Sequence, residues 1–193
     1  GGALATDAGL GVTTPIAMVG VSEKGHVDLL VKAYAEGGHA STPGRNDAAA
    51  LLSRVVSRIV DNPPEPHLIP VVARTLSEIG AWAGGPYPAV FANLWVTKPL
   101  VEQLMSKSPE TAAMLRTTYA VTQLKGSAAH NVLPAVAEAN LNVRVAPFET
   151  ISACTHACSS RMRGIGCAAH DGRGLDPQGV PLRRAGSHQP LGA

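Results

Sequence analysis

The strict alternation of apolar and polar residues in one segment constrains the fold of this chain most. The segment VAEANLNVRV, residues 136–145, places every second side chain on one face, as a strand with one buried face does. In a helix the same apolar side chains would be scattered around the axis, because a helix repeats after about 3.6 residues. The sequence therefore predicts a half-buried strand. Its apolar face consists of Ala137, Ala139, Leu141, Val143 and Val145.

A helical spacing follows Asn46 and Asp47, two residues that favour the N-cap position of a helix. Apolar residues then recur three and four positions apart, while Arg54 and Arg58 lie on the other face. The run ends at Asn62-Pro63-Pro64, which terminates a helix. We therefore expect an amphipathic helix whose apolar residues are Ala48, Leu51, Leu52, Val55, Val56, Ile59 and Val60.

Three more segments have strand-like patterns: residues 16–23, 26–35 and 119–124. Between the second and third of them, residues from about 62 to 118 form a helical insertion, with expected helices at about 71–83, 100–107 and 110–116. This order predicts an α+β fold. We expect a two-layer sandwich in which a four-stranded antiparallel sheet has helices on one face.

Composition excludes two classes of function. The formal net charge of +2 over 193 residues is too small to indicate nucleic acid binding. The uncharged window from Ile79 to Thr97 contains three glycines, two prolines and an asparagine, which would interrupt a membrane-spanning helix. We expect no membrane insertion and interpret this window as a buried loop or the wall of an apolar pocket.

Residues 151–193 differ from the rest of the chain. They are rich in Gly, Arg, Ser and Pro and have no sustained periodicity, so we expect an irregular, disordered tail. An out-of-frame reading of the gene from about codon 150 is an alternative. A second alternative is a zinc site, because the tail also contains four potential ligands, with His156 between the first two. These four are Cys154, Cys158, Cys167 and His170.

The stretch GGHASTP, residues 37–43, predicts a turn that displays a histidine. Glycines and a proline this close together are incompatible with the interior of a helix or strand. His39 therefore lies on the surface, and the residues alone leave open whether it has a chemical role.

This stretch and a second one, NVLP at residues 131–134 followed by NVR at 142–144, resemble the lid (dimerisation) domain of the aminoacylase/carboxypeptidase family of two-zinc metallopeptidases, peptidase family M20. The segments PIAMVGVSEKG, KPL and RTTYAVTQLKG are similar to the branch that contains carboxypeptidase S and the N-fatty-acyl-amino-acid hydrolases. The resemblance covers residues 1–150. It implies a lid domain at residues 16–150, with residues 1–15 as the edge of a catalytic domain.

The resemblance implies roles for three residues. His39 would reach across a homodimer and hydrogen-bond the oxyanion of the reacting amide, while Asn131 and Arg144 would bind the substrate carboxylate. His130 has no counterpart in the family motif, and we expect it to be exposed to solvent. The implied substrates are peptides or N-acyl amino acids.

The family's zinc ligands are absent from the sequence. It contains no Glu-Glu pair, and its His-x-Asp triplet, His26-Val27-Asp28, lies in a strand-like segment of the implied lid and not in a catalytic domain. We therefore expect zinc in the complete enzyme and none in this chain, which by itself would be inactive. The rival interpretation is a stand-alone dimerisation or interaction module without activity.

Overall fold

The computed structural model describes residues 2–5, 12, 14–162 and 167–170. The chain divides into two compact units. One unit comprises residues 1–25, 64–117 and 146–148, and the other comprises residues 26–63, 118–145 and 149–193. The chain alternates between the two units, so each unit is assembled from three separate segments of the sequence.

The second unit is built on a sheet with the strand order β5-β7-β3-β8. These strands are β5 (Thr118–Lys125), β7 (Val136–Val145), β3 (Gly25–Tyr34) and β8 (Cys167–His170). The pairs β5–β7 and β3–β8 are antiparallel. In the central strand β7, all five residues of the predicted apolar face are buried, which confirms the alternation on which the fold class was predicted.

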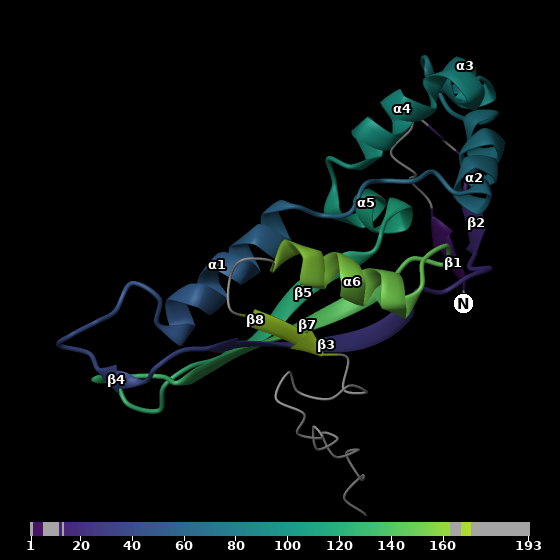
Figure 1. The fold of residues 1–193 in the computed structure, drawn as a ribbon. Coiled ribbons are helices and arrows are strands. Elements are labelled where there is room, and N and C mark those ends of the chain that lie inside the picture. Colours follow the sequence, from purple (N-terminus) through teal and green to yellow (C-terminus); the bar gives the residue numbers. More distant parts are fainter. Residues whose placement is uncertain (1, 6–11, 13, 163–166, 171–193) are drawn as a thin grey trace, which may run out of the picture. The chain divides into compact units, whose positions relative to one another are not determined.

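Two helices cover one face of this sheet, α1 (Ala48–Asp61) and α6 (Ile151–Arg161), and they lie side by side in Figure 1. The Asp47 carboxylate caps α1 by accepting a hydrogen bond from the Ala50 N–H at 2.9 Å, as predicted. Val60, which we assigned to the apolar face of α1, is 53% exposed. The residues that α1 buries against the sheet are Ala48, Leu52, Val55 and Ile59.

The α+β class is confirmed, but the sheet does not contain the four strands that we predicted. The expected strand at residues 16–23 is shorter, β2 (Ile16–Val19), and it pairs antiparallel with β1 (Gly2–Ala5) in a separate two-stranded sheet. The main sheet keeps the other three predicted strands, with β8 next to β3. The error has a physical reason: β2 has no alternation of buried and exposed side chains that would assign it to the main sheet.

The expectation of an irregular tail is wrong for residues 151–161, which form α6. Thr150 caps this helix, since its hydroxyl accepts a hydrogen bond from the Ala153 N–H at 3.2 Å. Cys154, Cys158 and Met162 are buried at helical spacing. We missed this stripe because the cysteines were considered as metal ligands rather than as small apolar side chains. Residues 163–166 and 171–193 lie outside the described residues.

The first unit contains the predicted helical insertion. Its helices are α2 (Pro70–Gly80), α3 (Tyr87–Ala92), α4 (Leu94–Met105) and α5 (Pro109–Leu115). We did not predict α3, and α4 begins six residues before the expected start because Pro99 is accommodated inside it. The small core of this unit consists of Leu68, Val72 and Leu115.

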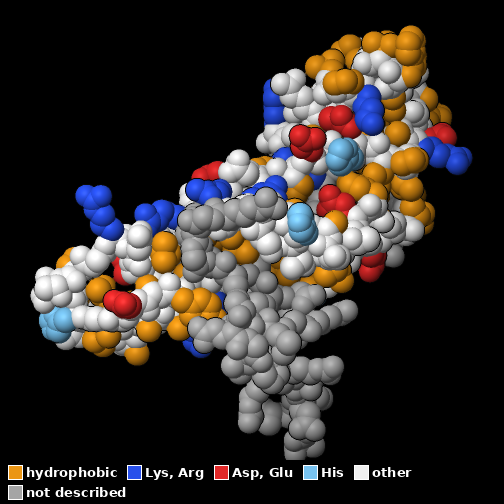
Figure 2. All heavy atoms as spheres, viewed as in Figure 1, with side chains coloured by type: hydrophobic (Ala, Val, Ile, Leu, Met, Phe, Trp, Pro, Cys, Tyr) orange, Lys and Arg blue, Asp and Glu red, His pale blue; other side chains and the backbone are white. Residues whose placement is uncertain are grey.

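The uncharged window at residues 79–97 forms the end of α2, all of α3 and the start of α4, so it is not a loop. Its tryptophans are exposed, Trp82 to 68% and Trp95 to 84%. Figure 2 shows hydrophobic side chains gathered over these helices. Among the described residues, no helix combines the length and apolar character that a membrane span requires.

Candidate functional site

The two sequence segments that carry the family resemblance meet in space. The strand β4 (Gly38–His39) pairs antiparallel with β6 (Val132–Leu133), with His39 opposite Val132. The Ala40 N–H extends this pairing by donating to the Asn131 carbonyl oxygen at 3.0 Å. Asn131 follows His39 by 92 positions in the sequence, yet their backbones lie side by side.

Close backbone contact explains one glycine of the motif. A Cβ atom at Gly37 would lie 3.2 Å from the Leu133 carbonyl oxygen and 3.4 Å from the Cβ atom of Ala135. The Ala35 N–H donates to the Ala135 carbonyl oxygen at 2.9 Å in the same region. Glycine at position 37 therefore lets the two segments approach, and this approach positions the histidine that follows.

The His39 ring is exposed and oriented by Ser41. The Ser41 N–H donates to the Nδ1 atom of His39 at 3.2 Å, and the Ser41 Oγ atom lies 2.9 Å from the same nitrogen. A nitrogen that accepts a backbone N–H carries no proton itself, so the neutral ring has its proton on Nε2. The strand β4 thus presents an Nε2–H donor to solvent. Sequence reasoning missed the role of Ser41, although a serine two residues after a turn histidine is a usable signal.

The other two predicted site residues are also exposed, but they lie apart. Asn131 is beside His39, whereas Arg144 is on β7, opposite Thr118 of β5. The eight residue-to-residue steps of extended strand from Val136 to Arg144 span roughly 27 Å. The structure therefore brings His39 and Asn131 together, and places Arg144 near the far end of the sheet. The Arg144 side chain makes no hydrogen bond or ion pair with another described residue. His130 is exposed, as expected.

The described residues contain no group of three or more His, Cys, Asp or Glu side chains that could hold a metal ion. Two of the four candidate ligands of the tail, Cys154 and Cys158, are buried in the core beneath α1. Burial raises the pKa of the Cys158 thiol to about 11, which disfavours the thiolate form that binds zinc. The side chains of Cys167 and His170 lie outside the described residues.

The first unit has an apolar groove between β2 and the insertion. The groove is about 590 Å³, and its lining includes Met18, Val19, Val71, Val72 and Met114. A smaller hollow of about 360 Å³ is lined by Trp82, Ile79 and Ile16, so part of the uncharged window is the wall of a hollow, as predicted. Neither hollow contains a group of polar side chains converging on one point.

These features define a two-layer α+β domain that presents an exposed histidine on a small two-stranded sheet. Residues 21–165 match the model of the M20 peptidase dimerisation domain. The chain belongs to this family of peptidase dimerisation domains. The match includes α6, beyond the boundary at Thr150 that the sequence suggested.

The curated relatives include a carboxypeptidase S-like protein of Dictyostelium discoideum, 38% identical over 141 residues, which are 72% of this chain and 27% of that protein. The human N-fatty-acyl-amino acid synthase/hydrolase PM20D1 is 33% identical over 139 residues, 71% of this chain and 28% of the relative. This chain thus spans little more than a quarter of these relatives. Among solved structures, human carnosine dipeptidase 1 has a similar fold, with a TM-score of 0.50 and 14% identity over 79% of this chain and 37% of its own.

Proposed function

We propose that this chain is the lid of a metal-dependent amidohydrolase that cleaves peptides or N-acyl amino acids with a free carboxylate. The observation that carries the proposal is the β4–β6 pairing, which holds an exposed His39 with Nε2–H as its free ring donor. An exposed and oriented donor is of little structural use, but it suits the stabilisation of negative charge on another molecule.

His39 stabilises the amide oxygen of the substrate as negative charge develops on it. A donor aimed at such an oxygen contributes about 3 kcal/mol to transition-state stabilisation, because its hydrogen bond strengthens as the charge forms. The Ser41 contacts support this role, since they leave Nε2 as the donor and keep the ring in one orientation.

Asn131 and Arg144 bind the substrate carboxylate, but they do so from different copies of the chain. The roughly 27 Å of strand between Val136 and Arg144 exceeds the length of a dipeptide or an amino acid head group. A site that contains both the β4–β6 pair and Arg144 therefore needs two subunits, with the β4–β6 pair of one reaching the Arg144 of the other. A homodimer through the lid is accordingly the functional form.

Zinc does not fit the part of the chain that the structure describes. No described cluster has enough ligands for even one ion, and a two-metal site needs several histidines and carboxylates. We place the two zinc ions of the family in a catalytic domain that this chain does not include, and we derive no step from them here.

Two measurements test the proposal. Light scattering should give the mass of a dimer at tens of micromolar, and a monodisperse, folded monomer there argues against a composite site. The purified chain with added zinc should hydrolyse neither dipeptides nor N-acyl amino acids. Turnover that His39→Ala abolishes would show that the chain carries its own catalytic centre, contrary to the proposal.

A stand-alone dimerisation module is the second candidate, favoured by the lack of a metal-binding cluster in the described residues. The carboxylate site separates the two functions. A module that only dimerises has no reason to bind N-acetyl-L-leucine at Arg144, whereas a substrate-binding lid does.

A further inference from the structure

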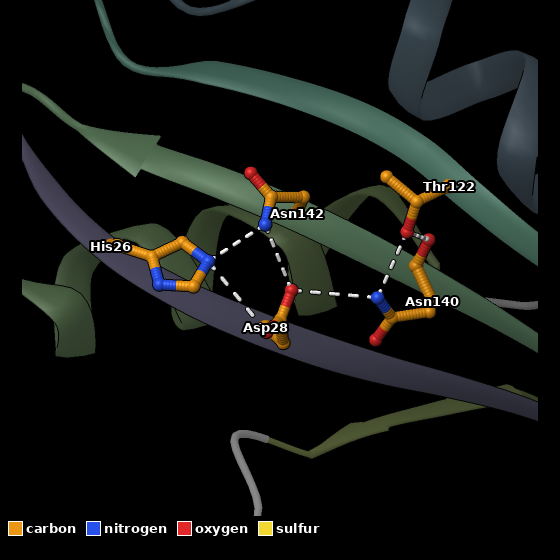
Figure 3. Close-up of polar contacts among 5 residues, drawn as sticks. All are labelled: His26, Asp28, Thr122, Asn140 and Asn142. Carbon is orange, nitrogen blue, oxygen red and sulfur yellow. Dashed lines mark hydrogen bonds and ion pairs between the residues drawn. The ribbon is translucent and has the colours of Figure 1, made fainter. Parts of the chain in front are cut away.

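A polar network covers the face of the main sheet that the helices leave open (Figure 3). It joins His26 and Asp28 of β3 to Asn140 and Asn142 of β7, and it reaches Thr122 of β5. The sequence analysis assigned no role to any of these five residues. The residues of β3 and β7 occupy the polar positions of strands whose other faces are buried, so the alternation that predicts the core also places these four on one surface. Thr122 lies at a register irregularity of β5, between Val121 and Gln123.

The Asp28 carboxylate determines the orientation of the Asn142 amide. Asn142 Nδ2 lies 3.0 Å from Asp28 Oδ1, and a carboxylate oxygen only accepts hydrogen bonds, so the amide nitrogen must face it. Asn140 Nδ2 faces the same oxygen at 3.4 Å and also donates to Thr122 Oγ1 at 2.9 Å. Two amides therefore converge on one carboxylate, and each has a fixed orientation.

The Asn142 amide in turn determines the tautomer of His26. Asn142 Nδ2 lies 2.7 Å from His26 Nε2, and as a donor it requires an unprotonated acceptor nitrogen. Asp28 Oδ2 also lies 3.6 Å from His26 Nε2, which is beyond hydrogen-bond distance. The neutral imidazole therefore carries its proton on Nδ1. The side chain of His26 is 47% exposed, so this Nδ1–H remains available to a ligand.

The register of β3 and β7 places His26 beside Arg144. Lys32 of β3 contacts Glu138 of β7, with Nζ 2.8 Å from Oε1. Asp28, four residues before Lys32, contacts Asn142, four residues after Glu138. Each step backward along β3 thus matches a step forward along β7, as in an antiparallel pair. Two further residues bring His26 opposite Arg144 on the same open face, where facing side chains of antiparallel strands start about 5 Å apart.

We propose that His26 is a second substrate-binding residue that acts with Arg144. The Arg144 guanidinium binds the substrate carboxylate through two parallel N–H donors, and the His26 Nδ1–H donates a third hydrogen bond to the same group. A neutral histidine is suited to this position because it adds a donor without the repulsion that a second cation beside Arg144 would cause. Asp28 and Asn142 are positioning residues that hold the required tautomer. This inference rests on the proposed carboxylate site at Arg144.

The tautomer is tested on the chain itself by the ¹⁵N chemical shifts of the histidine ring at a pH where the ring is neutral. We expect the Nδ1–H form for His26, and a return toward the Nε2–H form in Asn142→Val. His130, which is exposed and outside the network, serves as the reference ring. A predominant Nε2–H form of His26 in the wild-type chain overturns the inference.

Ligand binding is tested by NMR titration of N-acetyl-L-leucine. We expect His26→Ala to weaken binding about threefold to tenfold, the loss of one hydrogen bond. His26→Asn, whose amide N–H can replace Nδ1–H, should retain affinity within about twofold of the wild type, and His130→Ala should change nothing. Arg144→Gln should weaken binding at least about tenfold.

The outcomes separate the two levels of the argument. Unchanged binding by Arg144→Gln, or no saturable binding by the wild-type chain, overturns the carboxylate site and the proposed function with it. Loss of binding in Arg144→Gln together with unchanged binding in His26→Ala overturns the role of His26 alone. Equal losses in His26→Asn and His26→Ala also contradict that role, because they indicate that packing of the ring matters and not its donor.

Discussion

Replacing Cys158 by serine tests whether α6 belongs to the folded core. Cys158 is fully buried and packs in one cluster with Leu29 and Val143 of the sheet and Val55 of α1. Serine differs from cysteine mainly in its hydroxyl group, which loses its hydrogen bonds to water on burial. The substitution therefore changes polarity at a site whose packing is nearly preserved.

The expected loss in the free energy of unfolding is about 1–2 kcal/mol. Burying a hydroxyl without a partner costs about 1–3 kcal/mol in proteins, and a helical serine recovers part of this by bonding the carbonyl four residues earlier. For a chain of this length the midpoint of thermal unfolding should fall by about 2–8 °C. His156→Ser is the matched control, because His156 is exposed on the same helix and should change stability by less than about 0.5 kcal/mol.

Urea unfolding followed by circular dichroism measures both variants under the same conditions. A loss for Cys158→Ser that is at least twice that of the control supports the burial of α6. Equal and small effects would refute the reasoning, since they would mean that residues 151–161 do not pack on the sheet in solution. That result would restore the expectation that the chain becomes irregular after Thr150.

Three further predictions concern the same scaffold. Burial raises the pKa of Cys158 from 9.0 to about 11, so between these pH values the native state keeps a proton that the unfolded state loses. The free energy of unfolding should therefore fall by about 1.4 kcal/mol per pH unit from pH 9 to 11. This slope should be shallower in Cys158→Ser. Asp47→Ala removes the cap of α1 and should cost about 1 kcal/mol in urea unfolding, whereas Asp61→Ala at the other end of the helix should cost almost nothing. A Cβ atom at Gly80 would lie 2.9 Å from the Phe91 side chain of α3, so Gly80→Ala should destabilise the fold by about 1–2 kcal/mol through overpacking and lower the midpoint of thermal unfolding. Gly126→Ala is the control, because a Cβ atom there would meet open space.

The family motifs predict His39 and Asn131 as site residues, and the structure places their backbones side by side. The same motifs grouped Arg144 with them, although it lies far along β7. A motif specifies residue types and order but not the distance between them in space. The network around His26 was missed for a related reason: each member looks like an ordinary polar residue on an exposed strand face, and only the pairing of β3 with β7 brings them together.

The sequence by itself determined β7 and α1, because burial of one face imposes a period of two on a strand and of about 3.6 on a helix, and both periods are visible without a partner. Only the tertiary structure decided which strands share a sheet and where α6 packs. Backbone hydrogen bonds are the same for every strand, so β2 could pair with β1 as readily as with the main sheet. In α6 the apolar stripe is made of small thiols among serines, and its contribution becomes favourable only when the surface of α1 and the sheet is there to bury it.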